Sequence, residues 1–236
     1  MIKETEFPFI VPFRPKFQEL SFVGLKIGIP SKGEMFEGST NYLKQLGWNS
    51  SPFFSLRQLA AKNPENQALA LRLRSEDIIG ALKNGQLDLG ILGSDRILEG
   101  QLNGIPLTPL SFLGFGACEF CLSFPLENCP PAPSSFKELV EILKRGCIAT
   151  SLPKTFSYLM QREGIEIRPE QLKVMTGSVE IASKLFPEVI AVADIVSSGE
   201  TVMANNLRPD FRLITFPGAF LVSTREKLAQ LNLERR

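Results

Sequence analysis

The segment VIAVADIVSSGETVMANNL, residues 189–207, contains a strand, a tight turn and the start of a helix, in that order. In open α/β sheets, ligands bind at the carboxyl ends of strands, where a following helix offers free N–H groups to an anion. The hydroxyls and the glycine at 197–201 therefore predict a phosphate-binding turn, and Asp194 is placed to accept hydrogen bonds from hydroxyls such as those of a ribose. The alternative is an ordinary turn with capping hydroxyls and a surface aspartate.

Outside this segment, short apolar strand patterns alternate with amphipathic helix patterns, which is typical of α/β proteins with parallel strands. From about residue 111 the pattern changes to a longer pair of strands, and the chain later returns through two more strands to a charged helix. We therefore predict two α/β lobes. The predicted division is an N-terminal leader at 1–21, lobe I at 22–112 plus 207–236, and lobe II at 113–206, which carries the turn.

Composition excludes several classes of function. The 236-residue chain has a net charge of +1, so neither nucleic acid nor a membrane is an expected partner. It contains no histidine, which rules out Ser-His and Cys-His nucleophile schemes. No apolar run reaches the roughly 20 residues of a membrane-spanning helix, and the first residues do not resemble a signal peptide, so we expect a cytoplasmic protein. The cysteines at 118, 121, 129 and 147 are expected to be core thiols.

An ordered series of motifs resembles the ATP phosphoribosyltransferases. ADIVSSGETVMANNL is similar to the family's loop for phosphoribosyl pyrophosphate, and the resemblance covers roughly residues 25 to 225. The other matching segments are IPSKGEMFEGSTNYLKQLG, RLRSEDIIGALKNGQLDLGILGSDRILE, SFLGFGACEF and GSVEIASKL. The resemblance implies a two-lobed α/β fold like the type II periplasmic binding proteins, with mixed, mainly parallel sheets and helices on both faces.

The same resemblance implies a reaction and a set of site residues. The reaction is transfer of phosphoribosyl from phosphoribosyl pyrophosphate to N1 of ATP, the first step of histidine biosynthesis, with Mg²⁺ as cofactor and no metal ligand assigned to the chain. The implied catalytic residues are Lys32, Glu180 and Asp194. The implied substrate-binding residues are Ser197, Ser198, Gly199, Glu200, Thr201, Arg57, Asp77, Asp88 and Asp95. The alternatives are a solvated lysine at 32, a helix-cap carboxylate at 77 and a turn-capping residue at 88.

Several positions depart from the family pattern. Glu34 and Glu119 stand where the family usually has arginine, Ala117 replaces a lysine, and Ile190 replaces an aspartate. An acid near a bound phosphate opposes binding, so phosphoribosyl pyrophosphate binding is better supported than catalysis. The alternative functions are an inactive homologue that binds phosphoribosyl pyrophosphate or acts as an interaction subunit, and, with less support, a type I phosphoribosyltransferase.

The resemblance also implies partners. The chain lacks the extra C-terminal regulatory domain of the family's long form, so it resembles the short-form catalytic subunit. In the family, that subunit works with a regulatory subunit resembling a histidyl-tRNA synthetase. We therefore expect a homodimer that forms a hetero-oligomer with such a subunit. The Phe- and Pro-rich leader supports this expectation, because it is too apolar for a free tail.

Overall fold

The computed structural model describes residues 22–48, 58–127 and 133–231. These residues fall into two compact units. The second unit is Cys118–Phe216, and the first unit combines the described residues before Cys118 with those from Pro217 on. The predicted leader, Arg57 and Cys129 lie outside the described residues.

The first unit is built on a sheet that has six strands in the described residues, in the order β2-β3-β1-β4-β11-β5. Its strands are β1 (Lys26–Pro30), β2 (Ala60–Lys62), β3 (Leu69–Leu73), β4 (Leu89–Gly93), β5 (Leu107–Phe112) and β11 (Ala219–Thr224). Strands β3, β1 and β4 run parallel, and the others are antiparallel to their neighbours. The carboxyl ends of β3, β1 and β4 therefore share one edge of this sheet.

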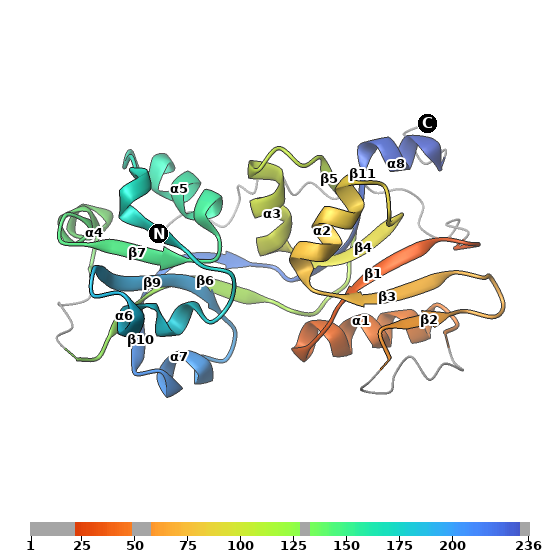
Figure 1. The fold of residues 1–236 in the computed structure, drawn as a ribbon, viewed down its shortest axis with the longest axis horizontal. Coiled ribbons are helices and arrows are strands. Elements are labelled where there is room, and N and C mark those ends of the chain that lie inside the picture. Colours follow the sequence, from red (N-terminus) through yellow and green to blue (C-terminus); the bar gives the residue numbers. More distant parts are fainter. Residues whose placement is uncertain (1–21, 49–57, 128–132, 232–236) are drawn as a thin grey trace. The chain divides into compact units, whose positions relative to one another are not determined.

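Helices cover both faces of the first sheet (Figure 1). They are α1 (Gly33–Gln45), α2 (Ser75–Lys83), α3 (Ser94–Leu102) and α8 (Arg225–Gln230). Leu43 of α1 packs in one buried cluster with Ile27 and Ile29, and Ile78 of α2 packs in another with Leu92. Because successive side chains of a strand point to opposite faces, this central sheet is apolar on both sides.

The second unit has a sheet of five strands in its described residues, in the order β10-β6-β9-β7-β8. Its strands are β6 (Cys118–Pro125), β7 (Cys147–Thr150), β8 (Leu172–Val174), β9 (Val189–Val196) and β10 (Leu207–Phe216). The helices are α4 (Phe136–Leu143), α5 (Pro153–Arg162), α6 (Ala182–Leu185) and α7 (Glu200–Ala204), with two 3₁₀ helices, η3 (Pro169–Gln171) and η4 (Val179–Ile181). Strands β9, β7 and β8 run parallel, so their carboxyl ends share one edge.

Helices again lie on both faces, with α4 and α5 on one and α6 and α7 on the other (Figure 1). Val179, Val192 and Val202 belong to one buried cluster, which places η4 and α7 over the face of β9 that carries Val192. Asp194 lies two residues further along β9 and therefore shares this face. The packing brings Asp194, η4 and the 197–201 turn to the same side of the sheet.

Strand β10 extends the second unit beyond the boundary that the sequence predicts. The predicted boundary returns the chain to lobe I at 207, whereas β10 pairs antiparallel with β6 from Leu207 to Phe216. The sequence predicts a returning strand here but not the sheet that it joins. Pro209 and the charged residues of β10 are tolerated because β10 is the edge strand of its sheet. The chain passes between the units after Ala117 and after Phe216.

The described cysteines are core thiols, as predicted. Cys118, Cys121 and Cys147 are buried and free of disulfides. Burial and the nearby Glu119 raise the pKa of Cys121 to about 11, although Arg212 acts in the opposite direction. Among the helices of the described residues, none is long and apolar enough to cross a membrane.

Candidate functional site

The carboxyl edge of the second sheet joins Asp194 to a serine that sequence reasoning missed. Parallel pairing places Thr150 beside Ala193, so Ser151, directly after β7, lies beside Asp194. The Ser151 hydroxyl donates a hydrogen bond to Asp194 Oδ1 at 3.0 Å. Asp194 is half-buried. The sequence signal for Ser151 was a hydroxyl at the end of an apolar strand, two residues before the proline that begins a helix.

Two further strands place residues in line with this pair. Asp194 is paired with Cys121 on β6, and Cys121 is paired with Arg212 on β10. Directly paired residues on neighbouring strands present their side chains on the same face of a sheet. Arg212, Cys121, Asp194 and Ser151 thus form one line that crosses β10, β6 and β9 and ends just after β7, and we call it the Asp194 row.

The turn after β9 has the strand, turn and helix that the sequence predicts. Gly199 adopts a left-handed conformation, with φ of +79°, at the residue before α7. The side chains of Ser197, Ser198, Glu200 and Thr201 are exposed. Ser198 Oγ accepts a long hydrogen bond, 3.4 Å, from the Glu200 N–H. The turn therefore presents hydroxyls to solvent close to Asp194 in the chain.

Glu180 lies on the same side of the second sheet. It is half-buried in η4, which follows β8 and begins after Ser178, a residue with φ of +45°. Its neighbour Val179 packs in the cluster that contains Val192 of β9. The structure thus gathers Glu180, Asp194 and the turn in one region of the second unit.

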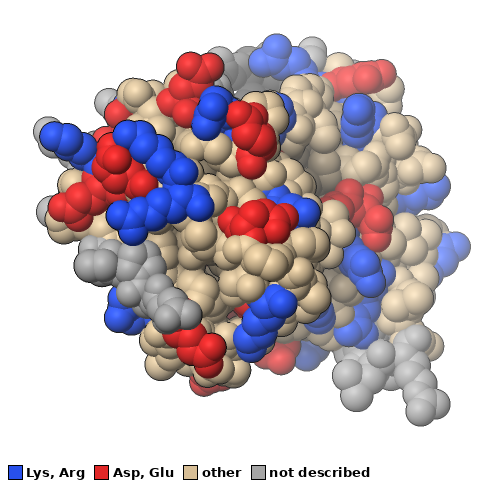
Figure 2. Space-filling model, turned by 60° about the vertical axis from the view of Figure 1, so that its left-hand side comes forward, with Lys and Arg blue, Asp and Glu red and all other residues tan. Residues whose placement is uncertain are grey.

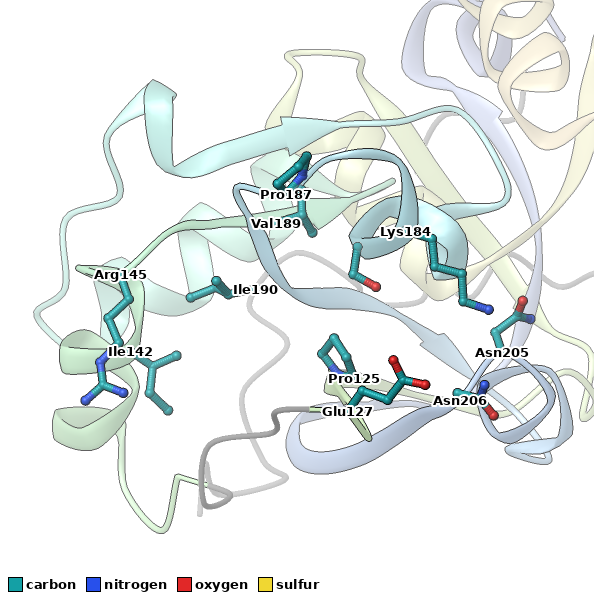
Figure 3. Close-up of a pocket in the computed structure, with 11 residues that line it drawn as sticks. Pro125, Glu127, Ile142, Arg145, Lys184, Pro187, Val189, Ile190, Asn205 and Asn206 are labelled. Carbon is teal, nitrogen blue, oxygen red and sulfur yellow. The ribbon is translucent and has the colours of Figure 1, made fainter.

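A pocket of about 580 Å³ lies at the opposite end of β9 (Figure 3). It is lined by Pro125, Glu127, Ile142, Arg145, Ser183, Lys184, Pro187, Val189, Ile190, Asn205 and Asn206. Ile190 is four residues from Asp194, which corresponds to about 13 Å along a strand. The replacement of an aspartate by Ile190 therefore changes the charge of this pocket rather than the charge beside Asp194.

In the first unit, three predicted site residues gather at the carboxyl edge of the parallel strands. Lys32 is exposed at the residue before α1, Asp77 is exposed in the first turn of α2, and Asp95 is buried in the first turn of α3. Burial raises the pKa of Asp95, and Arg96 partly offsets this effect. Arg96 contacts Asp95 Oδ2 at 3.4 Å and Glu76 Oε1 at 3.1 Å. This edge thus carries both signs of charge.

Asp88 lies at the opposite edge of the first sheet, directly before β4. Its Oδ2 accepts a hydrogen bond from the Lys26 N–H at 2.6 Å, and its Oδ1 is 2.8 Å from Lys227 Nζ. Ser223 Oγ also donates to the main-chain carbonyl of Asp88. These contacts connect β1, β4, β11 and α8, so the geometry of Asp88 fits the alternative of a structural residue. Arg57 lies outside the described residues.

The two glutamates that replace family arginines both have protein partners. Glu34 Oε1 accepts a hydrogen bond from the Gly116 N–H at 3.0 Å. Glu119 Oε1 is 2.8 Å from Arg212 Nη1. Ala117 is exposed just before β6. On the face shown in Figure 2, basic and acidic side chains are interspersed.

Comparison with known proteins shows similarity to ATP phosphoribosyltransferases. A family profile described as HisG, ATP phosphoribosyltransferase, matches residues 74–234. The chain is 35% identical over 183 residues to the ATP phosphoribosyltransferase of Nocardia farcinica, covering 78% of this chain and 59% of the relative. It is 29% identical over 225 residues to that of Gloeothece citriformis, covering 89% and 98%. The chain thus spans about three fifths of some of its relatives and nearly all of others.

Solved structures establish the fold class. An ATP phosphoribosyltransferase from a HisG:HisZ complex of Thermotoga maritima superposes with a TM-score of 0.62 at 21% identity, covering 88% of this chain and 91% of the other. The periplasmic aliphatic sulphonate-binding protein of Escherichia coli gives a TM-score of 0.51 at 16% identity, covering 89% and 68%. The predicted likeness to periplasmic binding proteins is therefore confirmed.

Proposed function

Because the chain belongs to the ATP phosphoribosyltransferase family, we propose that it transfers phosphoribosyl from phosphoribosyl pyrophosphate to N1 of ATP, the first step of histidine biosynthesis. The observation that carries the proposal is the carboxyl edge of the second sheet. There, Asp194 and the Ser151 hydroxyl are hydrogen-bonded and the exposed hydroxyl turn follows directly. This arrangement suits a ligand that has vicinal hydroxyls at one end and a phosphate at the other.

Each part of the edge has a proposed task. Asp194 accepts hydrogen bonds from the ribose hydroxyls, while Ser197, Ser198, Gly199 and Thr201 hold the 5′-phosphate. Glu200 is assigned to the same substrate. The reaction is a displacement at the anomeric carbon with oxocarbenium character, in which pyrophosphate leaves with its bonding electron pair. Holding both ends of the ribose phosphate fixes the anomeric carbon for attack by N1 of the adenine, which lowers the entropic part of the barrier.

Other carboxylates and one lysine complete the proposed site. Glu180 lies in the region of Asp194 and is assigned to the same ligand. In the first unit, Lys32 is assigned to phosphate groups because it is exposed at the carboxyl end of β1, and Asp77 and Asp95 are assigned to support that edge. Asp88 is assigned to stability instead.

Magnesium fits this site as an ion carried by the substrate. The described residues contain no group of three or more acidic or sulfur side chains able to hold a metal ion. Magnesium is commonly bound by one or two carboxylates together with substrate phosphates, and Asp194, three residues before the turn, offers such a carboxylate. When bound, the ion offsets the charge of the departing pyrophosphate.

The partners are part of the proposal. The Thermotoga maritima structure comes from a HisG:HisZ complex, which supports a regulatory subunit as partner of this chain. We expect a homodimer that associates with this subunit, and a cytoplasmic location, as for other soluble biosynthetic enzymes. Gel filtration with multi-angle light scattering, with and without the candidate subunit, measures both associations.

Thermal unfolding with added phosphoribosyl pyrophosphate and Mg²⁺ tests the binding step. A ligand selective for the folded state raises the midpoint of unfolding, so the wild type is expected to shift. Asp194→Ala and Thr201→Val are expected to abolish this shift while the unliganded midpoint stays nearly constant. Glu163→Ala, which removes an exposed acid of the same unit, is the matched control and keeps the shift. An equal shift in Asp194→Ala would contradict the assignment.

Absorbance of phosphoribosyl-ATP measures the chemical step. The wild type, mixed with ATP, phosphoribosyl pyrophosphate and Mg²⁺, is expected to form product, more rapidly with the regulatory subunit present. Binding of phosphoribosyl pyrophosphate without product in either condition would favour the alternative of a binding protein.

A further inference from the structure

The ion pair between Glu119 and Arg212 lies next to the proposed phosphate turn. Glu119 is paired with Val196, the last residue of β9, and the turn begins at the next residue. Glu119 and Cys121 are two residues apart and therefore share a face, the one that carries the Asp194 row. The carboxylate of Glu119 is thus on the side of the sheet that the turn and Asp194 occupy.

Arg212 reaches Glu119 from the neighbouring edge strand. Its Nη1 is 2.8 Å from Glu119 Oε1, and the Cys121 thiol lies 3.9 Å from Glu119 Oε2. The register pairs Arg212 with Cys121 rather than with Glu119, so the arginine side chain extends along the strands toward the turn. A positively charged guanidinium therefore lies beside the acid that β6 carries next to the turn.

An unpaired carboxylate at this position would repel a phosphate. Paired residues on neighbouring strands have Cβ atoms about 5 Å apart, and charges interact through solvent over about 8 to 10 Å at moderate salt. The turn that starts after Val196 is within this range of Glu119. A carboxylate paired with a guanidinium gives a much weaker field at that distance, because the two charges nearly cancel.

We propose that Arg212 neutralises Glu119 and thereby keeps the 197–201 turn able to accept the phosphate of phosphoribosyl pyrophosphate. Arg212 is a positioning residue that acts through Glu119 without touching the ligand. The inference rests on the proposed function, because it concerns the same phosphate. It explains how a chain with an acid at 119 retains an anion site.

Calorimetric titration with phosphoribosyl pyrophosphate and Mg²⁺ tests this in a double-mutant cycle. Arg212→Met is expected to raise Kd about 5- to 10-fold at low salt, and the loss shrinks at high salt because both side chains are partly exposed. Glu119→Gln alone binds at least as tightly as wild type. The double variant Glu119→Gln with Arg212→Met returns to within about twofold of wild type, since no unpaired charge remains.

Two controls separate charge from folding. Arg212→Lys keeps the positive charge and is expected to bind nearly as wild type does. Arg168→Met breaks another exposed ion pair of the second unit, the one with Glu170, which lies before the amino end of β8, and leaves Kd unchanged. Thermal unfolding without ligand verifies that each variant is folded.

The outcomes are distinct. An unchanged Kd in Arg212→Met overturns the inference while the proposed function stands. A weakened Arg212→Met that Glu119→Gln does not rescue also overturns it, because Arg212 would then act on the ligand directly. A wild type that does not bind phosphoribosyl pyrophosphate removes the proposed function and the inference together.

Discussion

The amino edge of the first sheet and the carboxyl edge of the second sheet each hold an aspartate, and the two are bonded very differently. Asp88 is held by the Lys26 N–H at 2.6 Å and the Lys227 ammonium at 2.8 Å. Asp194 accepts from the Ser151 hydroxyl at 3.0 Å, and exposed hydroxyls follow it along the chain. The first aspartate connects elements of its sheet, and the second faces groups that can serve a ligand.

Strand direction accounts for the difference. Asp88 precedes β4, whereas Asp194 is near the end of β9. In α/β sheets the carboxyl ends of parallel strands carry the ligand site, and the amino ends usually serve stability. Asp88 and Asp194 both match the family pattern, but their different surroundings predict different roles. The following predictions test this division, from the largest expected effect to the smallest.

The largest effect is expected on stability from Asp88→Ala. The side chains of Asp88 and Lys227 are 14% and 20% exposed, so removing the acid leaves a largely buried ammonium without this partner, at a cost of about 2–4 kcal/mol in the free energy of unfolding. Asp194→Ala is expected to cost less than about 1 kcal/mol. Urea unfolding measures both. Similar losses in the two variants would remove the distinction between the edges.

A smaller effect is expected on binding from Ser151→Ala. The hydroxyl orients Asp194, so its loss is expected to weaken phosphoribosyl pyrophosphate binding about 10-fold, in line with one hydrogen bond to a charged group. Ser151→Thr keeps the hydroxyl and is expected to retain most of the affinity. Calorimetric titration gives the dissociation constants. Equal weakening by both variants would point to packing rather than to the hydrogen bond.

The next effect concerns the backbone of the turn. An added Cβ at Gly199 would meet nothing within 4 Å, but the residue has φ of +79°. Gly199→Ala is therefore expected to lower the free energy of unfolding by about 1 kcal/mol through backbone strain alone. Gly199→Asn is expected to cost less, because asparagine tolerates this conformation better. A large loss in urea unfolding for both variants would show that space limits the turn.

The smallest effect is a pH dependence of stability caused by Asp95, which lies just after the carboxyl end of β4. Burial raises the pKa of Asp95 above 3.8, so between the unfolded and folded pKa values the folded chain binds more protons than the unfolded chain. The stability from protonated Asp95 is present at low pH and is lost as the pH rises through this window. Relative to wild type, Asp95→Asn is expected to gain stability as the pH rises above about 4. Urea unfolding across pH, with the exposed Asp77→Asn as control, measures the difference.

Most of the fold could be predicted because its strands are short apolar runs that end at glycine, proline or a polar turn. β1, β4 and β9 are examples, each followed by a helix or a turn. The strand of β10 was predicted but was assigned to lobe I, because only its pairing with β6 places it in the second sheet. The turn at 197–201 is local, which is why its conformation could be predicted.

The rest of the site depends on strand pairing. Ser151 and Asp194 are 43 residues apart, and the sequence alone does not give the register that makes them neighbours. Arg212 was missed for the same reason, and irregularities in the β10 pairing shift its position further. Asp88 lies in a family motif, but the structural role proposed for it depends on its ion pair with Lys227, which is distant in the sequence.

The Glu119–Arg212 pair also has an evolutionary consequence. The two residues are 93 positions apart, yet loss of Arg212 leaves an unpaired acid beside the turn, whereas loss of Glu119 leaves a base. Descendants that restore a base at 119 no longer need arginine at 212, whereas those that keep the acid do. The two positions are therefore expected to covary among relatives, and a sequence that carries the acid without a base on β10 is expected to bind the phosphate more weakly.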